Sequence, residues 1–182
     1  AGMKKIAETD SAPAVLAAAE KKKENIEDFK NLNKLALLEN ISDPGNLGTI
    51  IRSSAAFGVE GLLLFGCCID LYSPKVIRSA AGNFFKIPIV HINTLDELNK
   101  SFKNHVKISA ALSKDNNISL QECAGIEKRI IMLGSEAKGL SDELLQSADK
   151  NIRLEMRNNV ESLNLAVSAS IIFYELLSRR KI

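Results

Sequence analysis

Residues 34–65 read KLALLENISDPGNLGTIIRSSAAFGVEGLLLF, and two short apolar runs in this stretch flank one helical pattern. The first run, Leu35 to Glu39, predicts a buried strand. Asp43-Pro44 predicts a helix start, because aspartate caps helix N-termini and proline is favoured in the first turn. Gly58 can end that helix, and Leu62 to Phe65 predicts the second strand. This order indicates two parallel strands joined by a helical crossover.

The same alternation continues toward the C-terminus. Further strands are expected at residues 87–92, 106–112, 129–133 and 152–156. Helices are expected after Ser73-Pro74, after Thr94 (whose spacing to Glu97 is that of a capping box) and after Ser141. A long terminal helix is predicted, one side of which is lined by Leu163, Val167, Ser170, Ile171, Tyr174 and Leu177. The fold class is therefore α/β, with a largely parallel sheet and helices on both faces; the strand order cannot be read from the pattern.

The composition is that of an ordinary globular chain. Its 182 residues suffice for one domain with a sizeable core, and 46% of them are hydrophobic. No apolar run approaches the roughly 18 residues that a membrane helix needs, and the N-terminus lacks a signal-peptide core. We therefore expect a cytoplasmic protein without membrane contact. A net charge of +2 is too small for bulk attraction to nucleic acid, so any nucleic-acid contact must come from a local patch or a partner domain.

The cysteines and histidines do not form a recognisable site. Cys67, Cys68 and Cys123 have the spacing of neither a disulfide framework nor a metal site, so reduced thiols are expected. His91 and His105 lie in unrelated contexts. No metal site is predicted.

Residues 1–33 differ in composition from the rest of the chain. A small apolar stretch, Ala12 to Ala19, is followed by Lys21-Lys22-Lys23 and a charged segment that reaches Asn33. A solvated arm or linker is the first interpretation. The alternatives are a remnant of a missing RNA-recognition domain, or a basic arm near RNA. Residues 34–182 are expected to form the main domain.

Three segments concentrate polar and glycine residues at the ends of apolar strands, which is where open parallel sheets bind ligands. They are Asp43 to Arg52 (DPGNLGTIIR), Leu133 to Ser141 (LGSEAKGLS) and Met156 to Asn164 (MRNNVESLN). Gly134 and Gly139 let the backbone of the second segment approach a ligand closely.

These segments resemble the three sequence motifs of the SpoU/TrmH family of RNA ribose 2'-O-methyltransferases. Asn46 and Arg52 match the first motif, and Ser162, Leu163 and Asn164 match the third. The second motif is matched by Gly134, Glu136, Gly139 and Leu140. The resemblance spans about residues 34–178. It departs from the family at Asn158, where glycine is usual, although asparagine tolerates the left-handed backbone region better than most residues.

The resemblance implies a fold, a cofactor and a reaction. The fold would contain a deep C-terminal trefoil knot, and the protein would be a homodimer with its active site near the subunit interface. The cofactor would be S-adenosyl-L-methionine, and the substrate a ribose 2'-hydroxyl of structured RNA. Ribosomal RNA is favoured, and transfer RNA stays open. A non-catalytic RNA-binding module is the alternative from another class. A dinucleotide-binding enzyme is disfavoured, because the first loop lacks Gly-x-Gly-x-x-Gly.

The resemblance also implies site residues. The catalytic set is Arg52, Asn46, Glu136, Ser162 and Asn164, and the cofactor set is Leu133, Gly134, Glu136, Gly139, Ile152, Leu154, Ser162 and Leu163. Arg52 is expected to bind phosphate and stabilise a developing alkoxide, since a guanidinium stays protonated and makes a poor base. Glu136 is expected to orient Asn46 or Arg52, and Ser162 to cap the last helix.

One further cluster is a candidate for RNA contact. It comprises Lys75, Arg78 and Lys86, with Asn83 between them. Phe84 and Phe85 in the same stretch are expected to belong to the core rather than to stack on bases.

Overall fold

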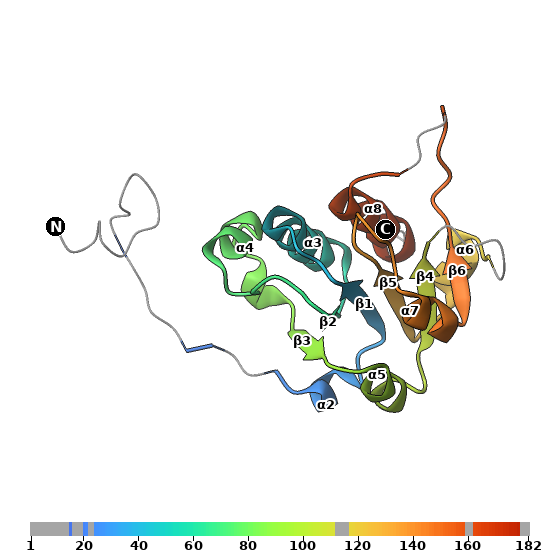
Figure 1. The fold of residues 1–182 in the computed structure, drawn as a ribbon, viewed down its shortest axis with the longest axis horizontal. Helices are drawn as coiled ribbons and strands as arrows, with labels where there is room; N and C mark the ends of the chain where they lie inside the picture. Colours follow the sequence, from blue (N-terminus) through green and yellow to red (C-terminus); the bar gives the residue numbers. More distant parts are fainter. Residues whose placement is uncertain (1–14, 16–19, 22–23, 112–116, 159–161, 179–182) are drawn as a thin grey trace.

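The computed structural model describes Val15 and residues 20–21, 24–111, 117–158 and 162–178 (Figure 1). Its centre is a six-stranded sheet in the order β3-β2-β1-β5-β4-β6, and every neighbouring pair is parallel. The strands are β1 Lys34–Glu39, β2 Gly61–Phe65, β3 Ile89–Ile92, β4 Val106–Ala110, β5 Arg129–Leu133 and β6 Lys150–Ile152. The predicted α/β class with a parallel sheet is confirmed.

Helices cover both faces of this sheet. They are α2 Ile26–Phe29, α3 Pro44–Phe57, α4 Pro74–Ser79, α5 Leu95–Ser101, α6 Leu120–Gly125, α7 Asp142–Ser147 and α8 Leu165–Phe173, with a 3-10 turn η1 Phe84–Lys86 and a π-helical turn η2 Tyr174–Ser178. One core cluster joins α3, α4, α6 and α8 to the sheet, and a second joins α2, α5 and α7. Figure 1 shows α4, α3 and α8 along one side of the sheet, with α2 and α5 on the other.

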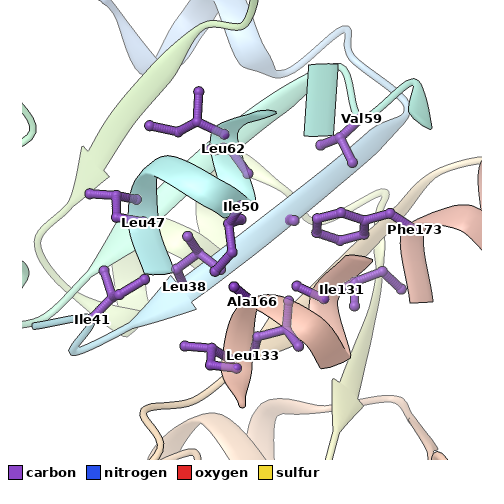
Figure 2. Packing of buried hydrophobic residues seen from close by; sticks show 14 of the residues in the cluster. Leu38, Ile41, Leu47, Ile50, Val59, Leu62, Ile131, Leu133, Ala166 and Phe173 are labelled. Atoms are coloured by element: carbon purple, nitrogen blue, oxygen red, sulfur yellow. The ribbon is translucent and has the colours of Figure 1, made fainter. Parts of the chain in front are cut away.

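Local sequence explains how α3 is placed over the sheet. The Asp43 carboxylate accepts a hydrogen bond from the Asn46 backbone N–H at 2.7 Å, and Gly58 ends the helix with a left-handed φ of 86°. Leu47, Ile50 and Ile51 are fully buried, and Figure 2 shows Leu47 and Ile50 packed near Leu38 of β1. A Cβ on Gly48 would lie 2.3 Å from the Ser79 Cβ, so this glycine permits close contact between α3 and α4.

The sequence misplaced some element boundaries. The last strand was expected at 152–156, but β6 spans Lys150–Ile152, pairs with β4 at the sheet edge and has one isolated bridge from Asn151 to Asn117 on its other side. Strands pair through their backbone groups, so an edge strand can form from polar residues. Lys150 and Asn151 are polar, and no apolar run therefore indicated a strand at these positions. Residues 87–88 and residue 111 also lie outside strands β3 and β4, and residue 112 lies outside the described residues.

One helix-start prediction needs correction, and one helix start was missed. Thr94 caps α5, but the Glu97 carboxylate accepts from the backbone N–H of Asn93 at 2.8 Å instead of from Thr94, so the capping box is incomplete. A complete box lies at Ser119 and Glu122, which begin α6. Each side chain there accepts from the other residue's backbone N–H. The hydrogen bonds that the Ser119 backbone N–H and hydroxyl donate to the Glu122 carboxylate lower the pKa of that carboxyl.

The terminal helix buries a different side from the one singled out by the sequence. Leu165, Ala166, Ala169, Ile172 and Phe173 are buried, whereas Leu163, Val167, Ile171 and Tyr174 are 36–47% exposed. The apolar residues extend around the helix, so periodicity alone could not identify the core-facing side. The side chain of Leu177 lies outside the described residues.

The packed part of the chain begins before Lys34. Phe29 of α2 is fully buried in the second core cluster, and the carbonyl of Asn33 accepts a hydrogen bond from the Arg129 backbone N–H at 2.8 Å. Residues 26–33 therefore belong to the folded body. Within the described residues, no helix is both long and apolar enough to cross a membrane.

Candidate functional site

A cavity of about 380 Å³ lies at the carboxyl ends of β4, β5 and β6. The walls include side chains from α8 and from the segments that follow β5 and β6. They contain all eight residues expected to hold a cofactor: Leu133, Gly134, Glu136, Gly139, Ile152, Leu154, Ser162 and Leu163. Parallel strands end together at this edge of the sheet, which explains why segments distant in sequence meet there.

The loop after β5 folds tightly back on itself. The Gly139 N–H donates to the Ser135 carbonyl at 2.8 Å, and Gly139 has a left-handed φ of 68°. A Cβ on Gly134 would lie 2.0 Å from the carbonyl carbon of Gly139 and 2.1 Å from the Leu140 nitrogen. Glycine is therefore required at position 134 for the two limbs of the loop to touch.

A buried carboxylate that the sequence analysis missed holds the far end of this loop. Glu39, at the end of β1, is 3% exposed, and its Oε2 accepts a hydrogen bond from the Ser141 N–H at 2.7 Å. Ser141 is also the N-cap of α7. The sequence did contain a signal for this role, since Glu39 directly follows the apolar run Leu35 to Leu38. A carboxylate at the end of a buried strand needs a hydrogen-bond partner.

The segment between β6 and α8 forms another wall of the cavity. Asn158 has a left-handed φ of 58°, so the residue that replaces the usual glycine adopts the expected backbone region. Ser162 lines the cavity but does not cap α8; that prediction was wrong. The cap is Asn164, whose Oδ1 accepts from the N–H groups of Ala166 and Val167 at 3.0 and 3.3 Å.

Asn46, Glu136 and Asn164 form one hydrogen-bonded cluster beside the cavity. Glu136 Oε1 accepts from Asn46 Nδ2 at 2.7 Å and from Asn164 Nδ2 at 2.8 Å. Asn164 Nδ2 also lies 3.0 Å from Asn46 Oδ1. A third donor to Glu136 is the Leu165 N–H at 3.3 Å. Each of the three sequence motifs thus contributes one side chain to the same cluster.

Arg52 lies outside this cluster. Six residues turn an α-helix by about 600°, which leaves Asn46 and Arg52 on sides of α3 about 120° apart. Ser53 lies on the same side of α3 as Asn46, and its hydroxyl oxygen is 2.6 Å from the hydroxyl oxygen of Ser170 in α8. Arg52 is exposed, and within the described residues no ion pair engages its guanidinium. Of the two partners expected for Glu136, the structure shows a hydrogen bond to Asn46 and, within the described residues, none to Arg52.

The cavity wall also includes residues that the motifs did not indicate. Charged groups are supplied by Lys138 and Arg153, and apolar groups by Met156, Leu145 and Ile172. Arg153, Leu154 and Met156 lie in the loop that follows β6. The sequence pattern assigned them to a strand, so it did not indicate this stretch as a ligand-binding loop.

Thiol and metal chemistry find no support near the cavity. Burial raises the pKa of the Cys123 thiol to about 11, although the neighbouring Arg129 charge lowers it, so the thiol stays protonated. Burial also raises the pKa of Cys68. In the part of the chain that is described, no three His, Cys, Asp or Glu side chains lie together as metal ligands would.

Comparisons with known proteins agree with these features. Residues 33–174 match the model of the SpoU rRNA Methylase family. The chain is 37% identical over 139 residues to an uncharacterized tRNA/rRNA methyltransferase of Synechocystis, covering 76% of this chain and 51% of that protein. It is 30% identical over 171 residues to the 23S rRNA (guanosine(2553)-2'-O)-methyltransferase RlmP of Bacillus subtilis, covering 94% and 67%.

A solved structure has the same architecture. The AdoMet-bound rRNA methyltransferase from Sinorhizobium meliloti superposes with a TM-score of 0.79 at 27% identity, covering 90% of this chain and 63% of that one. The chain thus spans about half to two thirds of the length of these proteins.

Proposed function

Because the chain belongs to the SpoU rRNA methylase family, we propose that it transfers a methyl group from S-adenosylmethionine to a ribose 2'-hydroxyl of structured RNA. Ribosomal RNA is the favoured substrate, since RlmP acts on 23S rRNA and the Sinorhizobium meliloti protein is an rRNA methyltransferase. The observation that carries the proposal is the cluster of Asn46, Glu136 and Asn164, which joins all three motifs beside one cavity.

The cavity fits the cofactor in size and in chemistry. Its volume of about 380 Å³ lies in the range of small-molecule sites, about 300–1,000 Å³. Leu133, Ile152 and Leu154 offer an apolar surface suited to an adenine ring, and the exposed loop backbone around Gly134 and Gly139 offers polar groups. We assign Ser162 and Leu163, on the opposite limb, to the same ligand. Glu136 adds a negative charge suited to a cationic sulfonium compound.

The cofactor supplies an electrophilic methyl group, so the chain has to align the ribose and assist loss of its proton. Glu136 holds the Asn46 and Asn164 amides in fixed orientations, and these amides position the ribose by hydrogen bonds. Arg52 binds a phosphate and stabilises charge that develops on the 2'-oxygen. The proton then passes to phosphate or water, because the guanidinium is already protonated.

We further propose that the protein is a homodimer in which the exposed side of α8 meets a second copy. Val167, Ile171 and Tyr174 are 46%, 39% and 47% exposed, and they lie on one side of the helix. Tyr174 packs edge-on against Phe57 of α3 at 5.6 Å, so this apolar side adjoins the helix that bears Arg52. Dimer formation would bury the stripe and bring a second α3 close to the active site.

The path of the C-terminal segment supports the proposed trefoil knot. Strand β6 lies at the sheet edge beside β4, yet α8 packs against α3 over the middle of the sheet. The chain therefore returns across the sheet after β6. The cytoplasm is the proposed compartment, consistent with the free thiols of Cys67, Cys68 and Cys123. We retain the N-terminal arm as a proposed linker to an RNA-recognition domain; residues 1–14, 16–19 and 22–23 lie outside the described residues.

The test has two steps. Calorimetric titration with S-adenosylmethionine and S-adenosylhomocysteine should show saturable binding at one site per subunit. The chain is then incubated with methyl-labelled cofactor and with unmodified ribosomal or transfer RNA. The RNA is digested, and label in a 2'-O-methylnucleoside is the expected result. RNA binding without cofactor binding would indicate the non-catalytic module instead, and label in transfer RNA alone would overturn the ribosomal assignment.

A further inference from the structure

The helices on the two faces of the sheet differ in charge. Helix α3, helix α4 and η1 contain four charged residues, all cationic and all exposed: Arg52, Lys75, Arg78 and Lys86. On the opposite face, α2, α5 and α7 contain Glu27, Asp28, Asp96, Glu97, Asp142 and Glu143, with Lys100 as their one cation. The small net charge of the chain therefore conceals a cationic surface over α3, α4 and η1, of the kind that nucleic-acid recognition requires, whereas α6 and η2 on the same face carry Glu122 and Glu175.

An exposed phenylalanine lies at the edge of this cationic surface, next to Lys86, and it also lines a pocket that includes Glu20 and Glu24. Phe85 is 80% exposed, whereas the preceding Phe84 is 8% exposed, so the expectation that both belong to the core was wrong for Phe85. A single 3-10 turn points the two rings in different directions. Exposing a phenylalanine forgoes about 1.5–3 kcal/mol of hydrophobic stabilisation, so the position of this ring is not explained by folding.

The surroundings of Phe85 hold the ring in place. It packs edge-on against Phe84 at 5.2 Å, and Phe84 packs against Tyr72 at 5.5 Å. The preceding turn is closed by Asn83 Nδ2, which donates to the carbonyls of Ala80 and Ala81 at 3.0 and 3.1 Å. Ala81 has a left-handed φ of 48° within this turn. The ring is thus a preorganised aromatic surface that faces solvent.

We propose that Phe85 stacks on an unpaired base of the RNA substrate while Lys75, Arg78 and Lys86 contact the flanking phosphates. This inference rests on the proposed function and identifies where the RNA lies. Stacking requires a base with a free face, which unpaired nucleotides in loops and bulges provide and paired A-form nucleotides do not. The surface is continuous with Arg52, because α4 packs against α3 at Gly48 and η1 also contacts α3.

The test compares Phe85→Ala, Phe85→Trp and the unaltered 182-residue chain. The probes are a hairpin oligoribonucleotide with 2-aminopurine in its unpaired loop and a fully paired duplex of the same length. Phe85→Ala should weaken hairpin binding about 5- to 150-fold, in line with one lost base stack, and abolish the change in 2-aminopurine fluorescence that binding produces. Phe85→Trp should retain both properties. Duplex binding and cofactor affinity should change less than about twofold, since neither involves a stacked loop base.

A matched pair of charge variants tests the phosphate contacts. Arg78→Ala should reduce the dependence of log affinity on log salt by about 0.7, the value for one phosphate contact on single-stranded nucleic acid. Lys103→Ala removes one exposed positive charge just after α5, on the acidic face, and should leave this dependence unchanged. Equal effects of the two variants would refute a specific cationic surface.

Other outcomes separate this inference from the proposed function. Methyl transfer by the unaltered chain, with hairpin binding unaffected by Phe85→Ala, overturns the stacking surface and leaves the enzyme assignment intact. Phe85-dependent hairpin binding without methyl transfer to any RNA supports the surface and overturns the activity. A change in sedimentation of Phe85→Ala would assign the ring to a protein interface, and failure of the unaltered chain to bind either probe would overturn the RNA surface.

Discussion

The side-chain amide nitrogen of Asn46 lies 2.7 Å from Oε1 of Glu136, although 90 residues separate them in sequence. The contact joins the start of α3 to the loop that follows β5. It forms because β1 and β5 are neighbours in the sheet, so that the segments after both strands begin at the same edge. Asn164 adds the start of α8 to the same carboxylate oxygen.

Glu136→Gln should therefore lower methyl transfer by about 100-fold, because misplaced orienting groups can cost that much in rate. The substituted amide loses the charge that attracts three N–H donors. Rate measurements at saturating cofactor check this prediction. Glu143→Gln, which alters an exposed acid of α7, is the control and should leave the rate unchanged. Equal rates for the two variants would contradict an orienting role.

Arg52→Ala should abolish detectable transfer while leaving cofactor affinity within about twofold, because Arg52 does not line the cavity and its proposed role is on the RNA. Arg52→Lys should recover only part of the activity, since lysine cannot bind a phosphate with the bidentate geometry of arginine. Calorimetry and single-turnover kinetics separate the two steps. Parallel loss of cofactor binding and transfer would sink the assignment of Arg52 to the chemical step.

Gly134→Ala should destabilise the fold by about 1–3 kcal/mol, the usual cost of overpacking, and should weaken cofactor binding. The added Cβ would lie 2.0–2.2 Å from backbone atoms of Gly139 and Leu140, so the loop has to open. Thermal unfolding and calorimetry measure the two effects. Gly125→Ala is the matched control, because nothing lies within 4 Å of the Cβ it would add. Similar melting temperatures for the two variants would show that the loop adapts.

The sequence predicted those parts of the fold in which burial and local capping act together. Strands β1, β2 and β5 are apolar runs, and α3 begins and ends at the predicted residues. Strand β6 was misplaced because its polar residues are stabilised by contacts across the edge. Asn151, for example, accepts a hydrogen bond from the Ser109 hydroxyl of β4. Such a contact depends on strand order, which residue patterns do not encode.

The sequence predicted which residues would belong to the candidate site but not how they are arranged in space. The motifs indicated Asn46, Glu136 and Asn164 together, yet only the neighbouring positions of β1 and β5 make their hydrogen bonds possible. Phe84 and Phe85 are a case in which the sequence could not predict burial. The two residues are identical in type and adjacent in sequence, so only the 3-10 turn determines which ring is buried.

Val167→Glu should convert a dimer into a monomer, because a carboxylate on the exposed side of α8 would be desolvated and left unpaired in the interface. Sedimentation analysis of the chain, with and without cofactor, measures the change. Gln146→Glu introduces the same charge at an exposed position of α7, on the opposite face of the sheet, and serves as the control. A monomeric unaltered chain, or a dimeric Val167→Glu variant, would contradict the proposed interface.

His105 should make the stability of the fold depend on pH below neutrality. Its Nε2 lies 2.7 Å from the Leu32 carbonyl oxygen, whereas its buried Nδ1 has no hydrogen-bond partner within the described residues. Burial lowers the pKa of this histidine below its ordinary value of 6.5, and the Lys128 charge acts in the same direction. The native state thus keeps the ring neutral under conditions in which the unfolded chain binds a proton.

The contribution of His105 to stability is therefore full above the unfolded pKa and is lost as the pH falls from there toward the lowered folded value. One proton gives a slope of at most about 1.4 kcal/mol per pH unit. Denaturant unfolding between about pH 7.5 and 5.5 measures this slope. His105→Gln keeps a donor for the Leu32 carbonyl but does not titrate, so its slope should be shallower. His91→Gln, at an exposed position, should keep the original slope; if His105→Gln also kept it, the neutral buried ring would not be its source.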